Sequence, residues 1–314
     1  MEPEWKFIVG AYGIRPDSMS GFAHDDRGLL VWRKIVQAAA IRSKSRKVRP
    51  MLAPIKIDNM NAYVGIPAGA GKKPAVIHLH ERYGIVQHTT DLGQKFVDAG
   101  YVTIVPDYFS RFTGDRQKLA AGDDRCELDD GQVLADTDAV VAYLRTVPQA
   151  DTSKVAMSGV CQTGRQPILV GAKRDYLCAT VVLYGAVYDA DWKPHRIRPE
   201  PIDKLMREIK CPLAAVFGEL DNLIHRDNIL RMFTVLAEAK KSFDIRIYPD
   251  APHGFLNDTM PGRYRRPQSD AAWSQITSFL RTVFAGEQKH DRAVWRFEAD
   301  TSVNYDFSSM KRWE

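Results

Sequence analysis

The chain has 314 residues, of which 45% are hydrophobic and 26% are charged, and its formal net charge is +5. This length is sufficient for one α/β domain of roughly 200–250 residues with extensions at its ends. The basic excess forms no long run, and its densest stretches are residues 42–49 and 263–266. We therefore expect no nucleic-acid partner, although a weak positive field could attract an anionic substrate.

Secretion and membrane insertion are not expected from this sequence. No window approaches the ~18 continuous apolar residues that a membrane helix requires. The first residues, Met1-Glu-Pro-Glu-Trp-Lys, are polar and do not resemble a signal peptide. The four cysteines, at positions 126, 161, 178 and 211, form no C-x-x-C pair and no disulfide framework. We expect a cytoplasmic protein with reduced thiols, and both a monomer and a homodimer fit the sequence.

The pattern of the chain predicts three parts. Residues 1–50 have weak periodicity and are expected to form an N-terminal arm. Residues 51–286 are expected to form the main domain, which opens with a β-hairpin around Asp58-Asn59. Residues 287–314 form a C-terminal tail, and its aromatic residues predict that it docks on another part of the protein.

Short β-branched runs alternate with helical patterns along the main domain. Nearly continuous apolar runs are typical of strands covered on both faces, and their alternation with helices predicts a doubly wound, mostly parallel sheet. The expected strands after the hairpin are residues 75–79, 101–105, 154–158, 179–183, 213–217 and 245–248. The expected helices are residues 91–99, 132–146, 162–172, 227–240 and 269–284.

A cysteine stands where this type of fold often carries its nucleophile. The strand 154–158 runs into Gly159-Val-Cys161-Gln-Thr-Gly164, which an apolar helical pattern follows. The spacing predicts a nucleophile elbow, in which small residues are needed where the backbone turns tightly. A cysteine at the N-terminus of the helix that follows would be favoured as a thiolate. A buried core cysteine before a glycine turn is the alternative for this motif alone.

An acid and a histidine follow in the order that an α/β-hydrolase triad requires. Asp221 comes directly after the strand 213–217, and His253 comes after the strand 245–248. The carboxyl ends of parallel strands lie at one edge of a sheet, so Cys161, Asp221 and His253 are expected to meet there. The sequence therefore predicts an α/β-hydrolase fold with a Cys-His-Asp triad.

The chain resembles the dienelactone hydrolase family from about Met51 to Phe284. The resemblance is carried by Gly159-x-Cys161, Gly218-x-x-Asp221 and Pro252-His253-Gly-Phe, and it extends to Glu81 after an early strand. It implies that Glu81 contacts the nucleophilic sulfur in the resting enzyme and helps to form the thiolate. It also implies an oxyanion hole made by the backbone N–H groups of Gln162 and Arg82.

The resemblance further implies how the substrate is bound. Arg111, in Asp107-Tyr-Phe-Ser-Arg111, matches an arginine that recognises a substrate carboxylate, and Tyr184 is expected in the same substrate-binding region. Thr163 departs from a glycine of the family elbow. Asn257 departs from a second carboxylate-binding arginine, which leaves open whether Arg263, Arg265 or Arg266 replaces it.

His78 and His80 alternate on a predicted strand before Glu81, a pattern that can indicate a metal site. A zinc site needs at least three protein ligands, and no further His or Asp cluster has a suitable spacing. We therefore expect that they line or flank the pocket, and we expect neither metal nor cofactor.

The predicted function is hydrolysis of a small ester or enol-lactone, neutral or anionic, through a thioester on Cys161. Two alternatives remain at this point: an esterase for neutral esters with the same triad, and a non-catalytic binding protein on the same fold.

Overall fold

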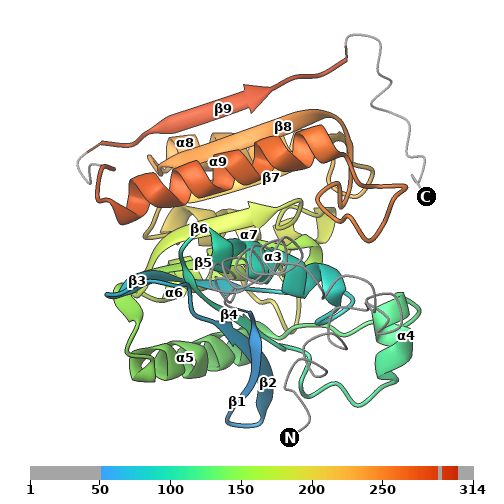
Figure 1. The fold of residues 1–314 in the computed structure, drawn as a ribbon. Helices are drawn as coiled ribbons and strands as arrows, with labels where there is room; N and C mark the ends of the chain where they lie inside the picture. The colour runs from blue at the N-terminus through green and yellow to red at the C-terminus, as the bar shows by residue number, and fades with distance from the viewer. Residues whose placement is uncertain (1–50, 289–291, 303–314) are drawn as a thin grey trace, which may run out of the picture. The chain divides into compact units, whose positions relative to one another are not determined.

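The computed structural model describes residues 51–288 and 292–302, so the expected arm at residues 1–50 lies outside the described residues. The described residues form a nine-stranded sheet in the order β1-β2-β4-β3-β5-β6-β7-β8-β9 (Figure 1). The strands are β1 (Ala53–Ile57), β2 (Met60–Gly65), β3 (Lys73–His78), β4 (Val102–Pro106), β5 (Ala150–Val160), β6 (Leu177–Leu183), β7 (Leu213–Leu220), β8 (Phe243–Pro252) and β9 (Trp295–Ala299).

Most of the sheet is parallel. The predicted hairpin is present, since β1 pairs antiparallel with β2, and Asp58 takes a left-handed φ of 50° in the turn between them. The strand β2 then pairs antiparallel with β4, and every later pair of neighbours is parallel. The parallel strands end at one edge, and the loops that carry the predicted triad leave the sheet there.

Helices cover both faces of the sheet, which confirms the predicted α/β-hydrolase fold. One buried apolar cluster joins α5, α6, α7 and α8 to one face, and a second joins α3 and α9 to the other. The helices are α3 (Gln87–Asp98), α4 (Arg116–Ala121), α5 (Asp130–Thr146), α6 (Arg165–Lys173), α7 (Ile202–Glu208), α8 (Arg226–Glu238) and α9 (Arg266–Phe284). None of the described helices is long and apolar enough to cross a membrane.

The sequence analysis missed three elements. Helices α4 and α7 have six and seven residues, which is too short for a helical period to be read from the sequence. The third is β9, which pairs in parallel with β8 and belongs to the segment predicted as a tail. There the Trp295 ring stacks on Phe243, with 6.2 Å between ring centroids, and its indole N–H donates to the Lys241 carbonyl.

The turn between β5 and α6 brings backbone against backbone. A methyl group at Gly159 would collide with the Thr163 carbonyl, and one at Gly164 would lie 2.7 Å from the Cα of Gly185. Only hydrogen fits at these two positions, because neither contact is with a flexible side chain that could move away. The glycines of the predicted elbow are thus required by close packing of the chain.

Replacing Gly164 with alanine should destabilise the protein through this contact. We expect Gly164→Ala to lower the free energy of unfolding by about 3 kcal/mol, the upper end of the usual cost of overpacking. Gly131→Ala is the control, because its methyl group would meet only the Asp129 carboxylate at 3.2 Å; it should change stability by less than about 1 kcal/mol. Urea denaturation of both variants measures the difference, and equal stabilities would contradict the packing argument.

Candidate active site

Five loops at the carboxyl edge of the sheet bring together the side chains that the sequence singled out. Glu81 follows β3, Cys161 follows β5, Tyr184 follows β6, Asp221 follows β7 and His253 follows β8. All five residues are less than 9% exposed, although every one of them has an ionisable side chain. Burial of this kind is costly unless partners are present, so the contacts of each group decide what it can do.

Cys161 occupies the strained position of the turn. Its φ is 51°, in the left-handed region that side chains other than glycine rarely adopt. The residue begins a 3-10 turn, Cys161–Gly164, that leads directly into α6. Such strain is common where a side chain must be displayed for function, and here it displays the sulfur above the sheet.

Thr163, which departs from the family pattern, ties this turn to the loop after β3. Its Oγ1 donates to the His80 carbonyl at 2.7 Å and accepts from the backbone N–H of Val160 at 2.9 Å. The side chain is fully buried. A glycine could make neither hydrogen bond, so Thr163 holds the Cys161 turn and the Glu81 loop in a defined register.

Cys161, His253 and Asp221 form one hydrogen-bonded row. The Cys161 Sγ lies 3.1 Å from His253 Nε2, and His253 Nδ1 donates to Asp221 Oδ2 at 2.8 Å. The other oxygen of Asp221 accepts from the backbone N–H groups of Leu223 and Ile224 at 2.8 and 2.9 Å. These bonds satisfy the buried carboxylate and direct it at the imidazole.

The surroundings of His253 favour its charged form. Burial alone would lower its pKa, but the carboxylate of Asp221 and the sulfur of Cys161 outweigh burial and raise the pKa well above the usual 6.5. A protonated imidazole beside a sulfur is the arrangement in which a thiolate and an imidazolium stabilise each other.

Glu81 lies in the same buried region, but its carboxylate has a different partner from the one that the resemblance implies. Glu81 Oε2 accepts from Asn257 Nδ2 at 3.2 Å, whereas the sulfur has hydrogen bonds with His253 and Tyr188. Burial raises the pKa of Glu81 above its usual 4.5, and the positive charges of His253 and Arg263 oppose that rise. Asn257, the second departure from the family, therefore contacts Glu81.

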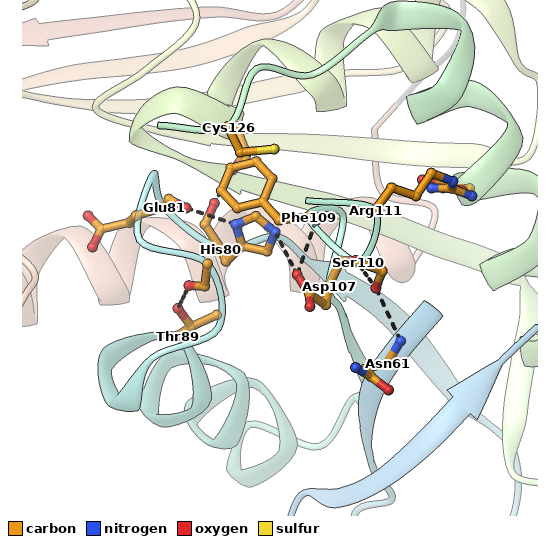
Figure 2. A network of polar contacts seen from close by, with 12 residues as sticks. Asn61, His80, Glu81, Thr89, Asp107, Phe109, Ser110, Arg111 and Cys126 are labelled. Carbon is orange, nitrogen blue, oxygen red and sulfur yellow. Dashed lines mark hydrogen bonds and ion pairs between the residues drawn. The ribbon is translucent and has the colours of Figure 1, made fainter. Parts of the chain in front are cut away.

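His80 fixes the peptide group between Glu81 and Arg82. A carbonyl oxygen only accepts, so His80 Nδ1 carries the proton that it donates to the Glu81 carbonyl at 2.8 Å (Figure 2). The Arg82 N–H belongs to the same planar peptide, so its direction is set as well. The ring packs on Phe109 with 4.4 Å between centroids.

Both histidines of the H-x-H pattern are buried. Burial, with His88 and His80 nearby, lowers the pKa of His78 to about 3, and burial also lowers the pKa of His80. Among residues 51–288 and 292–302, no group of three His, Cys, Asp or Glu side chains is arranged to hold a metal ion.

A small cavity of about 130 Å³ opens at the sulfur. A second cavity, of about 380 Å³, shares three of its lining residues: Arg82, Tyr83 and Arg263. Arg82 and Arg263 therefore line both cavities, and the Arg82 guanidinium donates to the carbonyl of Gly122, which lines the larger one, at 2.7 Å. The complete lining of the smaller cavity is Arg82, Tyr83, Cys161, Asn222, Leu223, Pro252, His253 and Arg263.

The two residues predicted to bind substrate do not line this cavity. Arg111 forms a two-bond ion pair with Asp136 of α5, at 2.8 Å for each bond, and Figure 2 shows its guanidinium directed away from His80 and Glu81. Tyr184 is fully buried, with the edge of its ring against His253 at 5.2 Å between centroids. The sequence analysis considered Arg263 only as one of three alternatives and gave no signal for Tyr188.

A parallel sheet with helices on both faces, a strained elbow after β5, and an acid and a histidine after β7 and β8 define an α/β-hydrolase. Residues 60–284 match the model of the dienelactone hydrolase family. The chain belongs to this family and is a hydrolase of carboxylic esters or lactones.

Individual relatives are distant but cover most of the domain. A candidate carboxymethylenebutenolidase of Methylorubrum extorquens is 28% identical over 226 residues, 70% of this chain and 76% of the relative. A candidate 2-oxo-3-(5-oxofuran-2-ylidene)propanoate lactonase of Bradyrhizobium is 26% identical over 234 residues, 72% of this chain and 91% of the relative. The crystal structure of a candidate dienelactone hydrolase from Klebsiella pneumoniae superposes with a TM-score of 0.66 at 25% identity, and covers 74% of this chain and 98% of that one.

Replacing Glu81 with glutamine should raise the stability of the protein and lower its catalytic activity. Burial raises the pKa of Glu81 in the folded state, so folding costs more when the carboxyl is ionised, and about 1.4 kcal/mol accompanies each unit of the rise. We expect Glu81→Gln to be more stable than the wild type near neutral pH. This gain should shrink as the pH falls towards 4.5 and disappear below it, and turnover of a slow substrate should decrease.

Thermal unfolding at several pH values and single-turnover rates measure the two effects. A stability difference that is independent of pH would contradict the assignment of a costly buried charge. An unchanged single-turnover rate would leave Glu81 with a structural role alone.

Proposed function

We propose that this enzyme hydrolyses an ester or lactone by nucleophilic attack of the Cys161 thiolate, through a thioester intermediate. The observation that carries the proposal is the row of hydrogen bonds from Cys161 Sγ through His253 to Asp221, at 3.1 and 2.8 Å. Such a row lets one imidazole manage the protons of both half-reactions while the carboxylate keeps it in the required tautomer.

In the first half-reaction the sulfur attacks the carbonyl carbon, and the carbonyl π-electrons move to oxygen. The backbone N–H groups of Gln162 and Arg82 are the proposed donors to this oxyanion, and a donor of this kind is worth about 3–4 kcal/mol. Collapse of the tetrahedral species breaks the bond to the leaving oxygen, which takes the proton of His253 Nε2. A simple ester gives a thioester on Cys161 and a free alcohol, whereas an enol-lactone gives one ring-opened thioester on Cys161 that carries the enol, which becomes a ketone.

In the second half-reaction water attacks the thioester. His253 Nε2 accepts a proton from the water, the water oxygen bonds to the carbonyl carbon, and the carbon–sulfur bond then breaks. The sulfur leaves with its electron pair as a thiolate beside the protonated imidazole. Glu81, held by Asn257 close to this site, is proposed to influence how much thiolate is present through its own charge.

The cavity favours an anionic substrate. Arg82 and Arg263 line the space next to the sulfur, and a guanidinium can bind a carboxylate through two parallel hydrogen bonds. Relatives named as a carboxymethylenebutenolidase and as a 2-oxo-3-(5-oxofuran-2-ylidene)propanoate lactonase agree with this class of substrate. We therefore assign the carboxylate to Arg263, because the guanidinium of Arg111 is paired with Asp136 and that of Arg82 donates to the Gly122 carbonyl at 2.7 Å.

Loss of Cys161, of His253 or of both should reduce kcat to about the same residual value. We expect Cys161→Ala to lose about 10⁴-fold or more in kcat, and His253→Ala to approach the same residual rate. Because the pair acts as a unit, the double variant should be scarcely slower than either single variant. Turnover of a chromogenic ester and of an enol-lactone measures this. Near-wild-type turnover in Cys161→Ala would contradict the role of Cys161 as the nucleophile, and absence of turnover in the wild type would favour the non-catalytic alternative.

The choice of arginine can be tested with a substrate pair. For an acidic lactone, Arg263→Gln should raise KM by about 10–100-fold, the usual worth of a hydrogen bond to a charged group. For the methyl ester of that lactone, KM should change little. Arg111→Gln is the control, because the same change of residue there removes a guanidinium bound to Asp136. Equal effects of Arg263→Gln on acid and ester would instead favour a neutral substrate.

A further inference from the structure

The sulfur of Cys161 has a second hydrogen-bond partner besides His253. The hydroxyl of Tyr188 donates to Cys161 Sγ across 3.4 Å. Burial, followed by the sulfur of Cys161, raises the pKa of Tyr188 well above 10, so the phenol stays protonated and remains a donor. Cys161 Sγ thus has two hydrogen-bond partners, the imidazole of His253 and the phenol of Tyr188.

A network of hydrogen bonds that includes Asp191 and Arg198 holds the backbone of Tyr188 in place. Its backbone N–H donates to Asp191 Oδ2 at 3.2 Å, and Asp191 Oδ1 accepts from Arg198 Nη1 at 3.4 Å. The Asp191 side chain is only 3% exposed. The next residue, Trp192, lies under the guanidinium of Arg231, 3.8 Å from its ring centroid. These contacts anchor the short turn Asp189–Trp192 directly after Tyr188, and so fix the position of the phenol.

We propose that Tyr188 is a catalytic residue that stabilises the thiolate of Cys161 by donating a hydrogen bond to its sulfur. The inference rests on the proposed function in that it takes Cys161 as the nucleophile. It extends the triad by a fourth group that makes direct contact with the reacting atom.

The hydrogen bond matters most when the thioester is hydrolysed. At that stage His253 Nε2 first accepts a proton from water, so until that proton has arrived the imidazole has no hydrogen on Nε2 to share with the sulfur. When the carbon–sulfur bond breaks, the electron pair moves to sulfur, and Tyr188 is the donor that already faces it. No proton leaves Tyr188 in this step, because the hydroxyl only shares its hydrogen with the departing thiolate.

The decisive variant is Tyr188→Phe, which removes one oxygen atom and keeps the ring. The readout is the rate of Cys161 alkylation by iodoacetamide as a function of pH, followed by mass spectrometry of the Cys161 peptide. The other three thiols react slowly in this range, because burial raises the pKa of Cys126 and Cys178 to about 11 and that of Cys211 to about 12. We expect the Cys161 profile to move to higher pH by about one unit, a tenfold loss of thiolate on its acid side.

Tyr176→Phe is the matched control. Its hydroxyl donates to Asp138 at 2.9 Å, and the residue precedes β6, at the opposite edge of the sheet from Cys161. This variant also loses one hydrogen-bonded hydroxyl, but its Cys161 profile should equal that of the wild type. A shift as large in Tyr176→Phe as in Tyr188→Phe would attribute the effect to general destabilisation and overturn the proposal.

A second substitution covers the case in which Tyr188→Phe does not fold. Replacement of Tyr188 by 3-fluorotyrosine makes the phenol a stronger donor with little change in shape, and should move the Cys161 profile to lower pH. An unchanged profile in both variants would overturn the role of Tyr188. Failure of the proposed function itself would be seen in a different measurement. In that case Cys161→Ala would keep its turnover, whatever the pH profile of Cys161 alkylation shows in the Tyr188 variants.

Discussion

The backbone at Cys161 carries the constraint on which the site depends. A φ of 51° at a residue with a side chain is unfavourable, and it persists because the chain on both sides leaves it no room to relax. Gly159 and Gly164 allow the backbone to approach itself and the Gly185 segment, and Thr163 joins the turn to the His80 carbonyl. The position of the sulfur is therefore a consequence of close packing around β5 and α6.

The same edge of the sheet concentrates charge in a region with little water. Asp221 accepts hydrogen bonds from two backbone N–H groups and from His253, and these bonds hold its carboxylate against the imidazole. Glu81 has one hydrogen bond from Asn257, and burial raises its pKa. The two carboxyl groups thus have different partners, since backbone N–H groups and the imidazole surround Asp221 while side chains donate to Glu81.

The cavity beside Cys161 is lined by residues that several loops contribute. The resemblance to the family directed attention to Arg111, but α5 places Asp136 opposite that guanidinium and pairs with it. Asn257 stands where a clamp arginine would be expected, and it contacts Glu81. Arg263 comes from the loop that follows, and it reaches the cavity beside the sulfur. A positive charge near the nucleophile is thus supplied from a different position in the chain.

The sequence alone determined the parallel sheet and the order of nucleophile, acid and histidine, because apolar runs, turn glycines and strand ends are local features of the chain. It also predicted that these three residues meet, since parallel strands end at one edge. Tertiary structure decided the rest. The pairing of Arg111 with Asp136, the contact of Tyr188 with the sulfur, and the pairing of β9 with β8 each join residues at least 25 positions apart. No local pattern encodes such contacts, because they depend on which loops and strand edges the packed sheet brings together.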